Sequence, residues 1–415
     1  MKIKIPYGKT EVYLNIPDKN LNEIISVSNS GQKNPDEDFI IKRALSNPVR
    51  SGRITELASN KRSACILVSD VTRPCPSFKF LPYIIDELNS GGIHDIKVVF
   101  GLGIHRKQTV AEKIRLAGNY AAKKAELLDS DSSKCRLIGC TSRGTPVEIF
   151  EEVLDADILM ATGNIEYHYY AGYSGGAKAL MPGVSSHKAI VKNHSLMSSV
   201  NASAGNFASN PVRMDIEEAG RIAGIDFIFN VILDDSNNII DAVSGANNEA
   251  FIEGIKRYDL ISGKKLKERS EIVIVSPGGY PKDINLYQSH KALENVQEIV
   301  TPGGKLVLLA ECCEGFGQET FKKWSNKVRD FSFLKKKIEK KFVFGIHKVL
   351  AISKILLNTE VFLYSGLSKK ETEEIGFIKI NDPQELIDRQ IDAKKDMKIT
   401  VVPGGRSVRL TGTGS

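Results

Sequence analysis

The chain has 415 residues, more than one hydrophobic core usually accommodates, so two domains are expected. Hydrophobic residues make up 41% of it and charged residues 26%, which is the composition of an ordinary soluble globular protein. The net charge of +7 is spread thinly, and no basic stretch alternates with stacking aromatic residues, which argues against nucleic acid and for small anions as partners.

The N-terminal stretch 1–17 alternates like a strand and lacks the apolar core and cleavage site of a signal peptide. No apolar run approaches the length of a membrane-spanning helix. The six cysteines show neither a CxxC metal pair nor the spacing of a disulfide framework. We therefore expect a cytoplasmic protein with reduced cysteines and no membrane contact.

Short apolar runs and amphipathic segments alternate along the chain. The runs predict buried strands at 64–68, 96–100, 158–161, 272–275 and 305–309. Segments of helical period lie between them, for example 78–88 and 211–223. This order predicts βαβ units, and hence an α/β fold of two domains with mostly parallel, Rossmann-like sheets.

The charged segment 262–269 marks the expected domain boundary. We expect an N-terminal α/β domain, a C-terminal α/β domain and a final strand with a flexible tail, at 1–268, 269–398 and 399–415. The strand-like run 399–402 could return to either sheet.

Polar residues follow the first two predicted strands, where parallel sheets bind ligands. Asp70 and Arg73 follow the first, and the guanidinium could hold a carboxylate through two hydrogen bonds. The second is followed by a glycine turn that delivers His105. Arg106 stands where a dinucleotide fingerprint would need its third glycine, which argues against an NAD site.

Residues 163–194 form the most informative stretch and hold three of the seven histidines. His168 offers a base that titrates near neutral pH. Gly175 and Gly176 precede a helix-like segment, so free amides there could hold a phosphate. Lys178 could be a phosphate counter-charge or an amine that bonds covalently to a cofactor, and the sequence leaves both roles open.

Two further helix-like segments carry polar pairs. His187 and His194 are seven residues apart and share a helix face, so one of them could ligate a metal. Gln288 and Lys291 are three apart and also share a face. The alternative interpretation is that such glycine turns and single histidines serve only packing, as they do in many α/β proteins.

Four segments, in this order, resemble the nickel-pincer-nucleotide lactate racemase family: DVTRP at 70–74, GLGIHR at 101–106, GYSGGAK at 172–178 and KNH at 192–194. The resemblance spans nearly the whole chain. It implies two α/β domains with the active site in the cleft between them. It also implies an isomerase, a racemase or epimerase of 2-hydroxy acids.

The resemblance also implies roles for individual residues. Lys178 matches the lysine that carries the pyridinium-3,5-bisthiocarboxylic acid mononucleotide, and His194 matches the protein ligand that completes the nickel coordination. His105 and His168 match the acid/base pair, while Arg73 and Lys291 match the substrate-binding groups. Further cofactor-pocket positions are Asp70, Ser174, Gly175, Gly176, Tyr287 and Gln288. Enzymes that make the cofactor are implied partners.

One position departs from the family. Its lactate enzymes carry a tryptophan against the cofactor in the second domain, whereas Trp324 lies too early and the comparable region, 344–348, reads FGIHK. The identity of the 2-hydroxy acid therefore stays open. Arg106, Lys107 and His347 are candidates for a second anion contact that would favour malate.

Chemistry favours hydride transfer for such an inversion, because the Cα hydrogen of a 2-hydroxy acid is too weak an acid for histidine. Two bases are useful, since the hydroxyl of each enantiomer points to a different side. The alternatives are a zinc hydrolase that uses His105, His168 and His194, and a non-catalytic nucleotide-binding protein. The sequence leaves the oligomeric state open.

Overall fold

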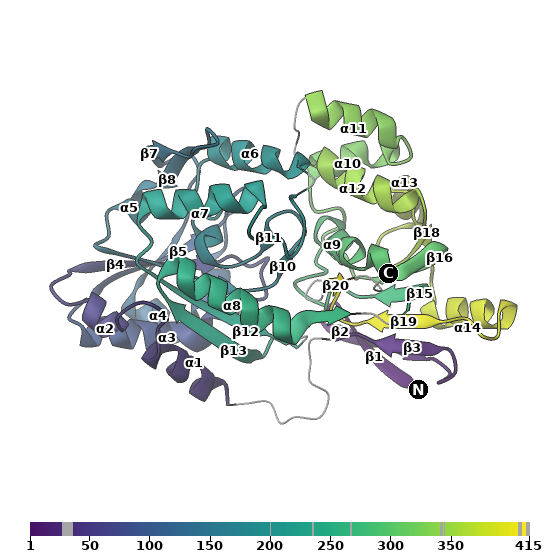
Figure 1. Cartoon of the computed structure of the whole chain (residues 1–415), viewed down its shortest axis with the longest axis horizontal. Coiled ribbons are helices and arrows are strands. Elements are labelled where there is room, and N and C mark those ends of the chain that lie inside the picture. The colour runs from purple at the N-terminus through teal and green to yellow at the C-terminus, as the bar shows by residue number, and fades with distance from the viewer. Residues whose placement is uncertain are drawn as a thin grey trace. The chain divides into compact units, whose positions relative to one another are not determined.

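The computed structural model describes residues 1–26, 36–199, 201–234, 236–265, 268–340, 343, 345–405 and 409–411. The chain forms two compact units: Met1–Asn29 with Ser262–Ser415, called the terminal unit below, and Ser30–Ile261, called the inserted unit. Figure 1 labels most of the elements of both. Each unit is an α/β structure around a mostly parallel sheet, which confirms the predicted fold class.

The inserted unit is built on a six-stranded sheet. Its strands, in spatial order, are β13 (Ile239–Gly245), β12 (Phe227–Leu233), β9 (Ile158–Asn164), β4 (Ser63–Ser69), β5 (Asp95–Gly101) and β6 (Glu126–Asp129). All neighbours are parallel except β12 and β13. Three of these strands, β4, β5 and β9, confirm the predicted apolar runs. Their carboxyl ends meet at one edge, where ligands bind in such sheets.

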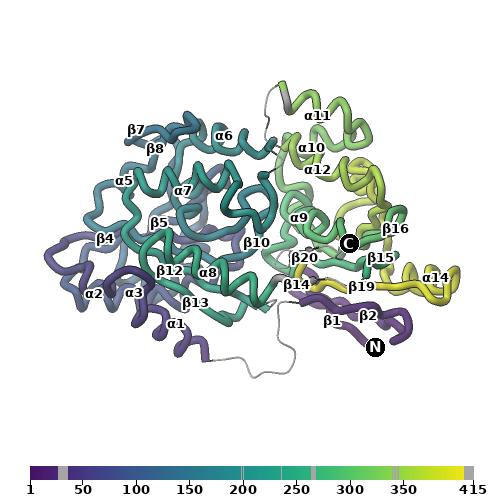
Figure 2. The backbone as a smooth tube through the Cα atoms, in the orientation of Figure 1, coloured from purple at the N-terminus to yellow at the C-terminus, as the bar shows by residue number. Residues whose placement is uncertain are grey.

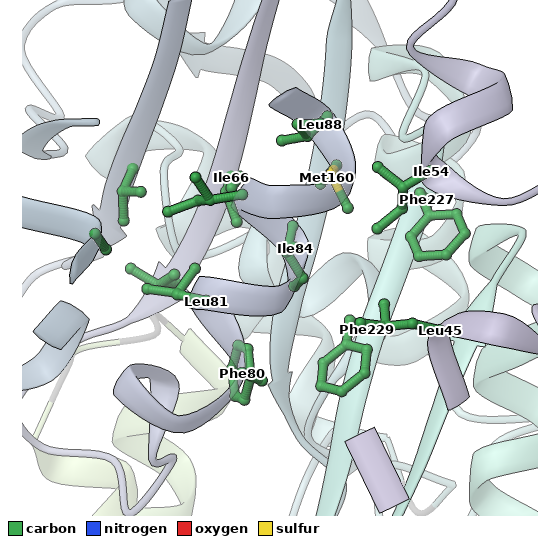
Figure 3. Close-up of a cluster of buried hydrophobic side chains, with 14 of the residues drawn as sticks. Leu45, Ile54, Ile66, Phe80, Leu81, Ile84, Leu88, Met160, Phe227 and Phe229 are labelled. Carbon is green, nitrogen blue, oxygen red and sulfur yellow. The ribbon is translucent and has the colours of Figure 1, made fainter. Parts of the chain in front are cut away.

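Both faces of this sheet are buried, which explains the continuous apolar runs. On one face Ile66 and Met160 pack with Phe80 and Leu81 of α3; Figure 3 shows this cluster. On the other face Leu67 belongs to a core that α7 and α8 help to form. The helices of the unit are α1 (Glu37–Ser46), α2 (Ile54–Leu57), α3 (Ser77–Ser90), α4 (Val110–Lys124), α5 (Glu151–Leu154), α6 (His187–Ser195), α7 (Pro211–Ala223) and α8 (Asn247–Ser262).

Small elements carry the residues between β9 and α6. A two-stranded antiparallel pair, β10 (Tyr167–His168) with β11 (Gly172–Tyr173), is followed by the 3₁₀ turn η1 (Gly176–Ala179). Outside this segment, a second antiparallel pair joins β7 (Cys135–Cys140) to β8 (Pro146–Phe150) before β9, and η2 (Leu196–Ser198) follows α6. Within the histidine-rich stretch, residues 163–194, the part between β9 and α6 is therefore one short hairpin and turns.

The terminal unit contains a second six-stranded sheet, parallel throughout. Its order is β18 (Ile378–Lys379), β17 (Glu360–Tyr364), β16 (Val300–Leu309), β15 (Ser270–Val275), β19 (Ile399–Val402) and β3 (Leu21–Ile24). The predicted strands at 272–275 and 305–309 are confirmed, and the run 399–402 joins this sheet. A hairpin of β1 (Lys2–Tyr7) and β2 (Thr10–Asn15) precedes β3, and β14 (Gly263–Lys265) pairs with β20 (Arg409–Thr411).

The helices of the terminal unit are α9 (Leu286–Val296), α10 (Glu319–Trp324), α11 (Phe331–Lys340), α12 (Ile346–Leu356), α13 (Lys369–Glu374) and α14 (Pro383–Ala393), with 3₁₀ turns η3 (Gln297–Ile299) and η4 (Ser325–Lys327). Among the described residues of both units, no helix is long and apolar enough to cross a membrane. The six cysteines are free thiols.

The compact units divide the chain differently from the expected domains at its N-terminal end. We expected residues 1–268 to form one domain, but Leu21 of β3 pairs with Ile399 of β19 in the terminal unit. Figure 2 shows the purple N-terminal trace beside the yellow strand β19. The charged segment 262–269 does lie at one boundary between the units. Local charge, however, carries no information on the pairing of β3 with β19, which are far apart in the sequence.

Candidate active site

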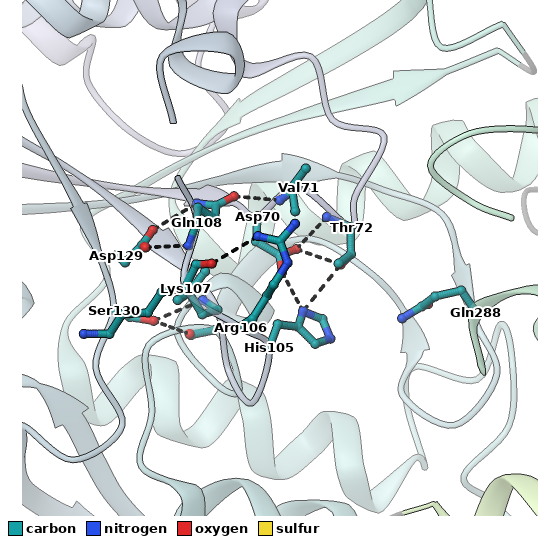
Figure 4. A network of polar contacts seen from close by, with 12 residues as sticks. Asp70, Val71, Thr72, His105, Arg106, Lys107, Gln108, Asp129, Ser130 and Gln288 are labelled. Atoms are coloured by element: carbon teal, nitrogen blue, oxygen red, sulfur yellow. Dashed lines mark hydrogen bonds and ion pairs between the residues drawn. The ribbon is translucent and has the colours of Figure 1, made fainter. Parts of the chain in front are cut away.

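The loops after β4 and β5 bring a carboxylate and an imidazole together (Figure 4). Oδ2 of Asp70, which is 2% exposed, lies 2.5 Å from Nδ1 of His105. The Thr72 hydroxyl donates to Oδ1 of Asp70 at 2.8 Å. Burial alone would raise the pKa of Asp70, but the charges of His105 and Arg73 and the hydrogen bonds hold it below its ordinary value. Asp70 is thus an ionised partner of Nδ1, and Nε2 is the nitrogen that can act on a substrate.

Arg73 closes the same loop. Its amide donates to the Asp70 carbonyl at 3.1 Å. Its Nη1 is buried and has no hydrogen-bond partner among the residues that the structure describes. A buried guanidinium nitrogen without an acceptor is suited to an anionic ligand such as a carboxylate.

Gln108 and Asp129 tie these loops together, and sequence reasoning missed both. The Val71 amide donates to Oε1 of Gln108 at 2.9 Å, and Nε2 of Gln108 donates to Asp129 at 3.0 Å. Figure 4 shows this network beside Asp70 and His105. The signal available was the position of Asp129 at the end of β6, an unpredicted strand.

Arg106 and Lys107, two of the candidates for a second anion contact, form ion pairs with acidic side chains of this chain. Nη2 of Arg106 lies 2.7 Å from Glu112, and Nζ of Lys107 lies 3.5 Å from Asp131. Both cationic side chains are more than half exposed. This arrangement is that of surface ion pairs.

His168 lies in β10 and is 5% exposed. The Ala171 amide donates to its Nδ1 at 3.3 Å, so a neutral ring carries its proton on Nε2. Tyr169 stacks on the ring with centroids 5.2 Å apart, and Tyr170 meets it edge-on at 4.5 Å. Tyr169 and Tyr170, called the aromatic wall below, therefore hold the imidazole in place.

The β10–β11 hairpin is anchored by Asp259 of α8, a residue that sequence reasoning missed. The hydroxyls of Tyr167 and Tyr173 donate to this carboxylate at 2.7 and 2.8 Å. Tyr167 precedes His168 and Tyr173 precedes Ser174, so Asp259 fixes both the base and the start of the glycine turn.

The glycine turn differs from the expected anion cradle. The Ser174 amide donates to the Glu166 carbonyl, and the Gly176 amide donates to Oδ1 of Asn230, both at 2.8 Å. The segment that follows is a four-residue 3₁₀ turn rather than an α-helix. These two amides are thus occupied within the chain, and no α-helix begins here. The half-buried Lys178 lies in this turn.

His194 and His187, expected on one face of a helix, differ in exposure. His187 begins α6 and is exposed, whereas His194 is 6% exposed. The Tyr170 hydroxyl contacts Nε2 of His194, which links this ring to the aromatic wall around His168. Within the described ranges, no group of three or more His, Cys, Asp or Glu side chains is placed to hold a metal ion.

In the terminal unit, α9 brings Gln288 and Lys291 together as their spacing predicts. Nζ of Lys291 donates to Oε1 of Gln288 at 2.6 Å, and both residues are buried. The N-cap Asn285 accepts from the Gln288 amide at 3.0 Å. Burial, together with the charge of Lys348, lowers the pKa of His290 to about 4, so this imidazole is neutral near pH 7.

Tyr287 lies against α12, the region compared with the family tryptophan. Nζ of Lys348 is 5.3 Å from its ring centroid, and the His347 ring is 6.4 Å away. Phe344 lies outside the described residues. Trp324 instead stacks on Phe333 at 6.1 Å.

Residues 7–205 match the lactate racemase N-terminal domain and residues 265–410 match the lactate racemase C-terminal domain. A lactate racemase of Thermoanaerobacterium thermosaccharolyticum is 32% identical over 98% of both chains. One of Lactiplantibacillus plantarum is 31% identical over 77% of both.

Among solved structures, the lactate racemase apoprotein from T. thermosaccharolyticum superposes with a TM-score of 0.88 at 30% identity, covering 99% of this chain and 100% of that one. A protein from Thermotoga maritima superposes with a TM-score of 0.69, covering 92% of this chain and 100% of that one. Its identity of 14% supports a shared fold alone.

Proposed function

The chain belongs to the lactate racemase family and is therefore an isomerase, and on this premise we propose that it interconverts the enantiomers of lactate or a related 2-hydroxy acid. The observation that carries the proposal is the Asp70–His105 pair beside Arg73, whose buried Nη1 has no acceptor among the described residues. A base next to a carboxylate-binding group is what a 2-hydroxy acid requires.

We propose a nickel-pincer nucleotide as the cofactor, with Lys178 as its covalent attachment point and His194 as a nickel ligand. The residues present fit this group. A buried imidazole is a suitable nickel donor, and a single protein ligand suffices because the nucleotide would supply the other donors. Coordination through Nε2 of His194 would require the Tyr170 hydroxyl to give up its contact. When bound, the cofactor would accept a hydride from the substrate and return it.

The protein's residues would then position the substrate and move its hydroxyl proton. Arg73 binds the carboxylate and keeps the planar 2-keto acid in place while it reorients. His105 takes the hydroxyl proton of one enantiomer through Nε2. His168 would serve the other, which requires its Nδ1 to give up the Ala171 amide, since that bond leaves the ring's proton on Nε2. Lys291, oriented by Gln288, contributes a second positive charge for the substrate.

Two alternatives make different predictions for metal content and mass. A zinc hydrolase would need a set of protein ligands, and the described residues offer no group of three. A non-catalytic nucleotide-binding protein needs neither metal nor adduct.

Metal analysis and intact mass of the loaded protein test the proposal. We expect nickel together with a covalent mass increment at Lys178 that Lys178→Ala abolishes. Zinc without an adduct would support the hydrolase, and an adduct that persists in Lys178→Ala would overturn the assignment.

Loss of optical rotation across a panel of 2-hydroxy acids then identifies the substrate. His105→Ala and His168→Ala should each retain nickel and lose most turnover. Deuterium at the substrate Cα should be retained during inversion, and free exchange with water would contradict hydride transfer. A cytoplasmic location and dependence on cofactor-making enzymes are parts of the same proposal.

A further inference from the structure

We propose that Arg213 and Asn230 are positioning residues that fix the turn before Lys178, so that its amine is held ready for cofactor attachment. This role rests on the proposed function, because it presupposes that Lys178 carries the cofactor. Both side chains are fully buried, and neither lies in the motifs that carry the family resemblance.

Arg213 of α7 holds two carbonyls of the turn at once. Its Nη1 donates to the Tyr173 carbonyl at 3.2 Å and its Nη2 donates to the Gly175 carbonyl at 3.0 Å. The planar guanidinium suits this task because its donors have a fixed spacing. The Phe251 ring lies beneath it, 3.9 Å from the guanidinium carbon.

The link to Lys178 runs through one atom. The carbonyl oxygen of Gly175 that accepts from Arg213 also accepts from the Lys178 amide, at 3.3 Å. The orientation of this peptide group therefore sets the start of the 3₁₀ turn on which Lys178 lies.

Asn230 holds the other side of the turn from the central sheet. It lies in β12, opposite Gly163 of β9, and its Oδ1 accepts from the Gly176 amide at 2.8 Å. Its Nδ2 donates to the Phe229 carbonyl at 3.0 Å, which fixes the orientation of the amide group. The turn is thus fastened to a rigid strand.

The glycines show how closely the turn lies on these side chains. A Cβ on Gly175 would be 2.9 Å from Oδ1 of Asn230, and one on Gly176 would be 2.9 Å from Nη2 of Arg213. Both glycines also have positive φ angles, +88° and +58°. Glycines at these two positions therefore allow the turn to lie directly against Arg213 and Asn230. From the sequence alone, this role could not be distinguished from phosphate binding.

The buried ion pair of Arg213 argues for a role beyond stability. Nη2 lies 2.7 Å from Glu217, and neither side chain is more than 6% exposed. Burial lowers the pKa of Arg213 and raises that of Glu217, so burial disfavours both charges. Since apolar residues often stabilise such a location as well or better, the carbonyl contacts of the guanidinium explain why an arginine is there.

Two variants separate positioning from stability. Arg213→Lys keeps the positive charge beside Glu217 but loses the fork that spans two carbonyls. Glu217→Gln removes the ion pair but keeps the fork. We expect the Gly176 and Lys178 amides to exchange with deuterium about 10-fold faster in Arg213→Lys, while amides of β4 and β5 are unchanged.

In Glu217→Gln these two amides should exchange as in the wild type. Equal exchange in Arg213→Lys and the wild type, or equally fast exchange in both variants, would overturn the proposal. Asn230→Ala provides a second measurement if Arg213→Lys does not fold, and its Gly176 amide should lose protection. Unchanged protection in that variant would overturn the proposal too.

The functional readout is the rate at which the chain, incubated with the nickel-pincer nucleotide, gains covalent mass at Lys178. We expect about a tenth of the wild-type rate in Arg213→Lys and a near wild-type rate in Glu217→Gln. Equal rates in both variants would contradict positioning. If the wild type gains no mass, the proposed function fails, whereas hydrogen exchange still decides whether Arg213 and Asn230 fix the turn.

Discussion

Asp70 directs a buried negative charge at a single imidazole. It accepts from Thr72 and pairs with Nδ1 of His105, and its pKa lies below the ordinary value despite burial. Such a carboxylate fixes the ring and stabilises the imidazolium that forms when His105 takes a proton. It is thus a positioning and charge-stabilising residue for the proposed base.

We predict that Asp70→Asn lowers kcat by about 10- to 100-fold, because a hydrogen bond to a charged group is worth about 1.5–3 kcal/mol. The asparagine oxygen can still accept from Nδ1, so the ring stays in place and only the charge is lost. Thr72→Ala is the matched control, since it removes the hydroxyl's bond to Asp70 at 2.8 Å and its contact with Nδ1 of His105 at 3.4 Å but keeps the carboxylate. Racemisation rates of the cofactor-loaded variants test this prediction. Equal kcat in Asp70→Asn and the wild type would show that Asp70 has no part in the mechanism.

The same charge makes stability depend on pH. Since the pKa of Asp70 is lower in the folded chain than its ordinary value of 3.8, ionised Asp70 stabilises the fold above that value. This stabilisation is lost as the pH falls through the folded-state pKa. The difference in unfolding free energy between the wild type and Asp70→Asn should therefore shrink below about pH 4. Urea titrations from pH 7 to pH 3 measure it, and a difference that grows on acidification would refute the assignment.

At the residue scale, the sequence predicts polar residues that directly follow strands. It misses residues that contact the site but lie far from it in the sequence. Asp70 and His105 were identified because they follow buried runs, whose carboxyl ends share one edge of a sheet. Arg213, Asn230 and Asp259 were not, because each contacts the histidine-rich stretch from at least 38 residues away. Nothing in local spacing marks such a contact.

At the scale of elements, the buried parallel strands and the helix that carries His187 and His194 were predictable, and the turns around Gly176 were not. The runs at β4, β5 and β9 are apolar along their length because both faces of the sheet are covered. Segment 211–223 has a helical period and forms α7 with the same bounds. At Gly175 and Gly176, by contrast, Arg213 and Asn230 hold the backbone from distant elements, and the segment that follows is a four-residue 3₁₀ turn instead of the α-helix that the local pattern suggested.

We predict that Gly176→Ala destabilises the chain more than Gly224→Ala. Both glycines have positive φ, so alanine costs about 1–2 kcal/mol at either position. A Cβ at Gly224 meets nothing within 4 Å, whereas one at Gly176 meets Arg213 and Phe251 at 2.9 Å. The midpoints of urea unfolding of the two variants measure the difference. Equal midpoints would show that the turn accommodates a Cβ at Gly176 with no additional loss of stability.

At the scale of the whole molecule, the residues of one unit interrupt those of the other along the sequence. Residues 30–261 form the inserted unit, and the terminal unit is completed by the first 29 residues. Chain length and the alternation of strand-like and helix-like segments could predict two α/β units. They could not predict that the first residues belong with the last ones, because β3 and β19 pair across almost the whole sequence.

This arrangement predicts how fragments fold. The N-terminal hairpin and the residue after it contribute Ile3, Ile5, Leu14 and Ile16 to a core with residues of β15 and β19. At about 1.5–3 kcal/mol for each buried side chain, their loss removes about 6–12 kcal/mol, comparable to the whole stability of a typical domain. Removal of the first 29 residues also removes β3, which leaves one edge of β19 without its partner strand.

We therefore predict that residues 262–415 alone fail to fold cooperatively. A chain in which a flexible Gly/Ser linker of about 10–15 residues replaces residues 30–261 should fold, because it restores the hairpin and β3. Residues 30–261 alone should fold as well, since the cores of that unit draw on its own elements. Near-ultraviolet circular dichroism and urea unfolding of the three fragments provide the measurement. Cooperative unfolding of 262–415 without the N-terminal residues would show that the hairpin and β3 are accessory to that unit, and the assignment of the chain's first 29 residues to its core would then be wrong.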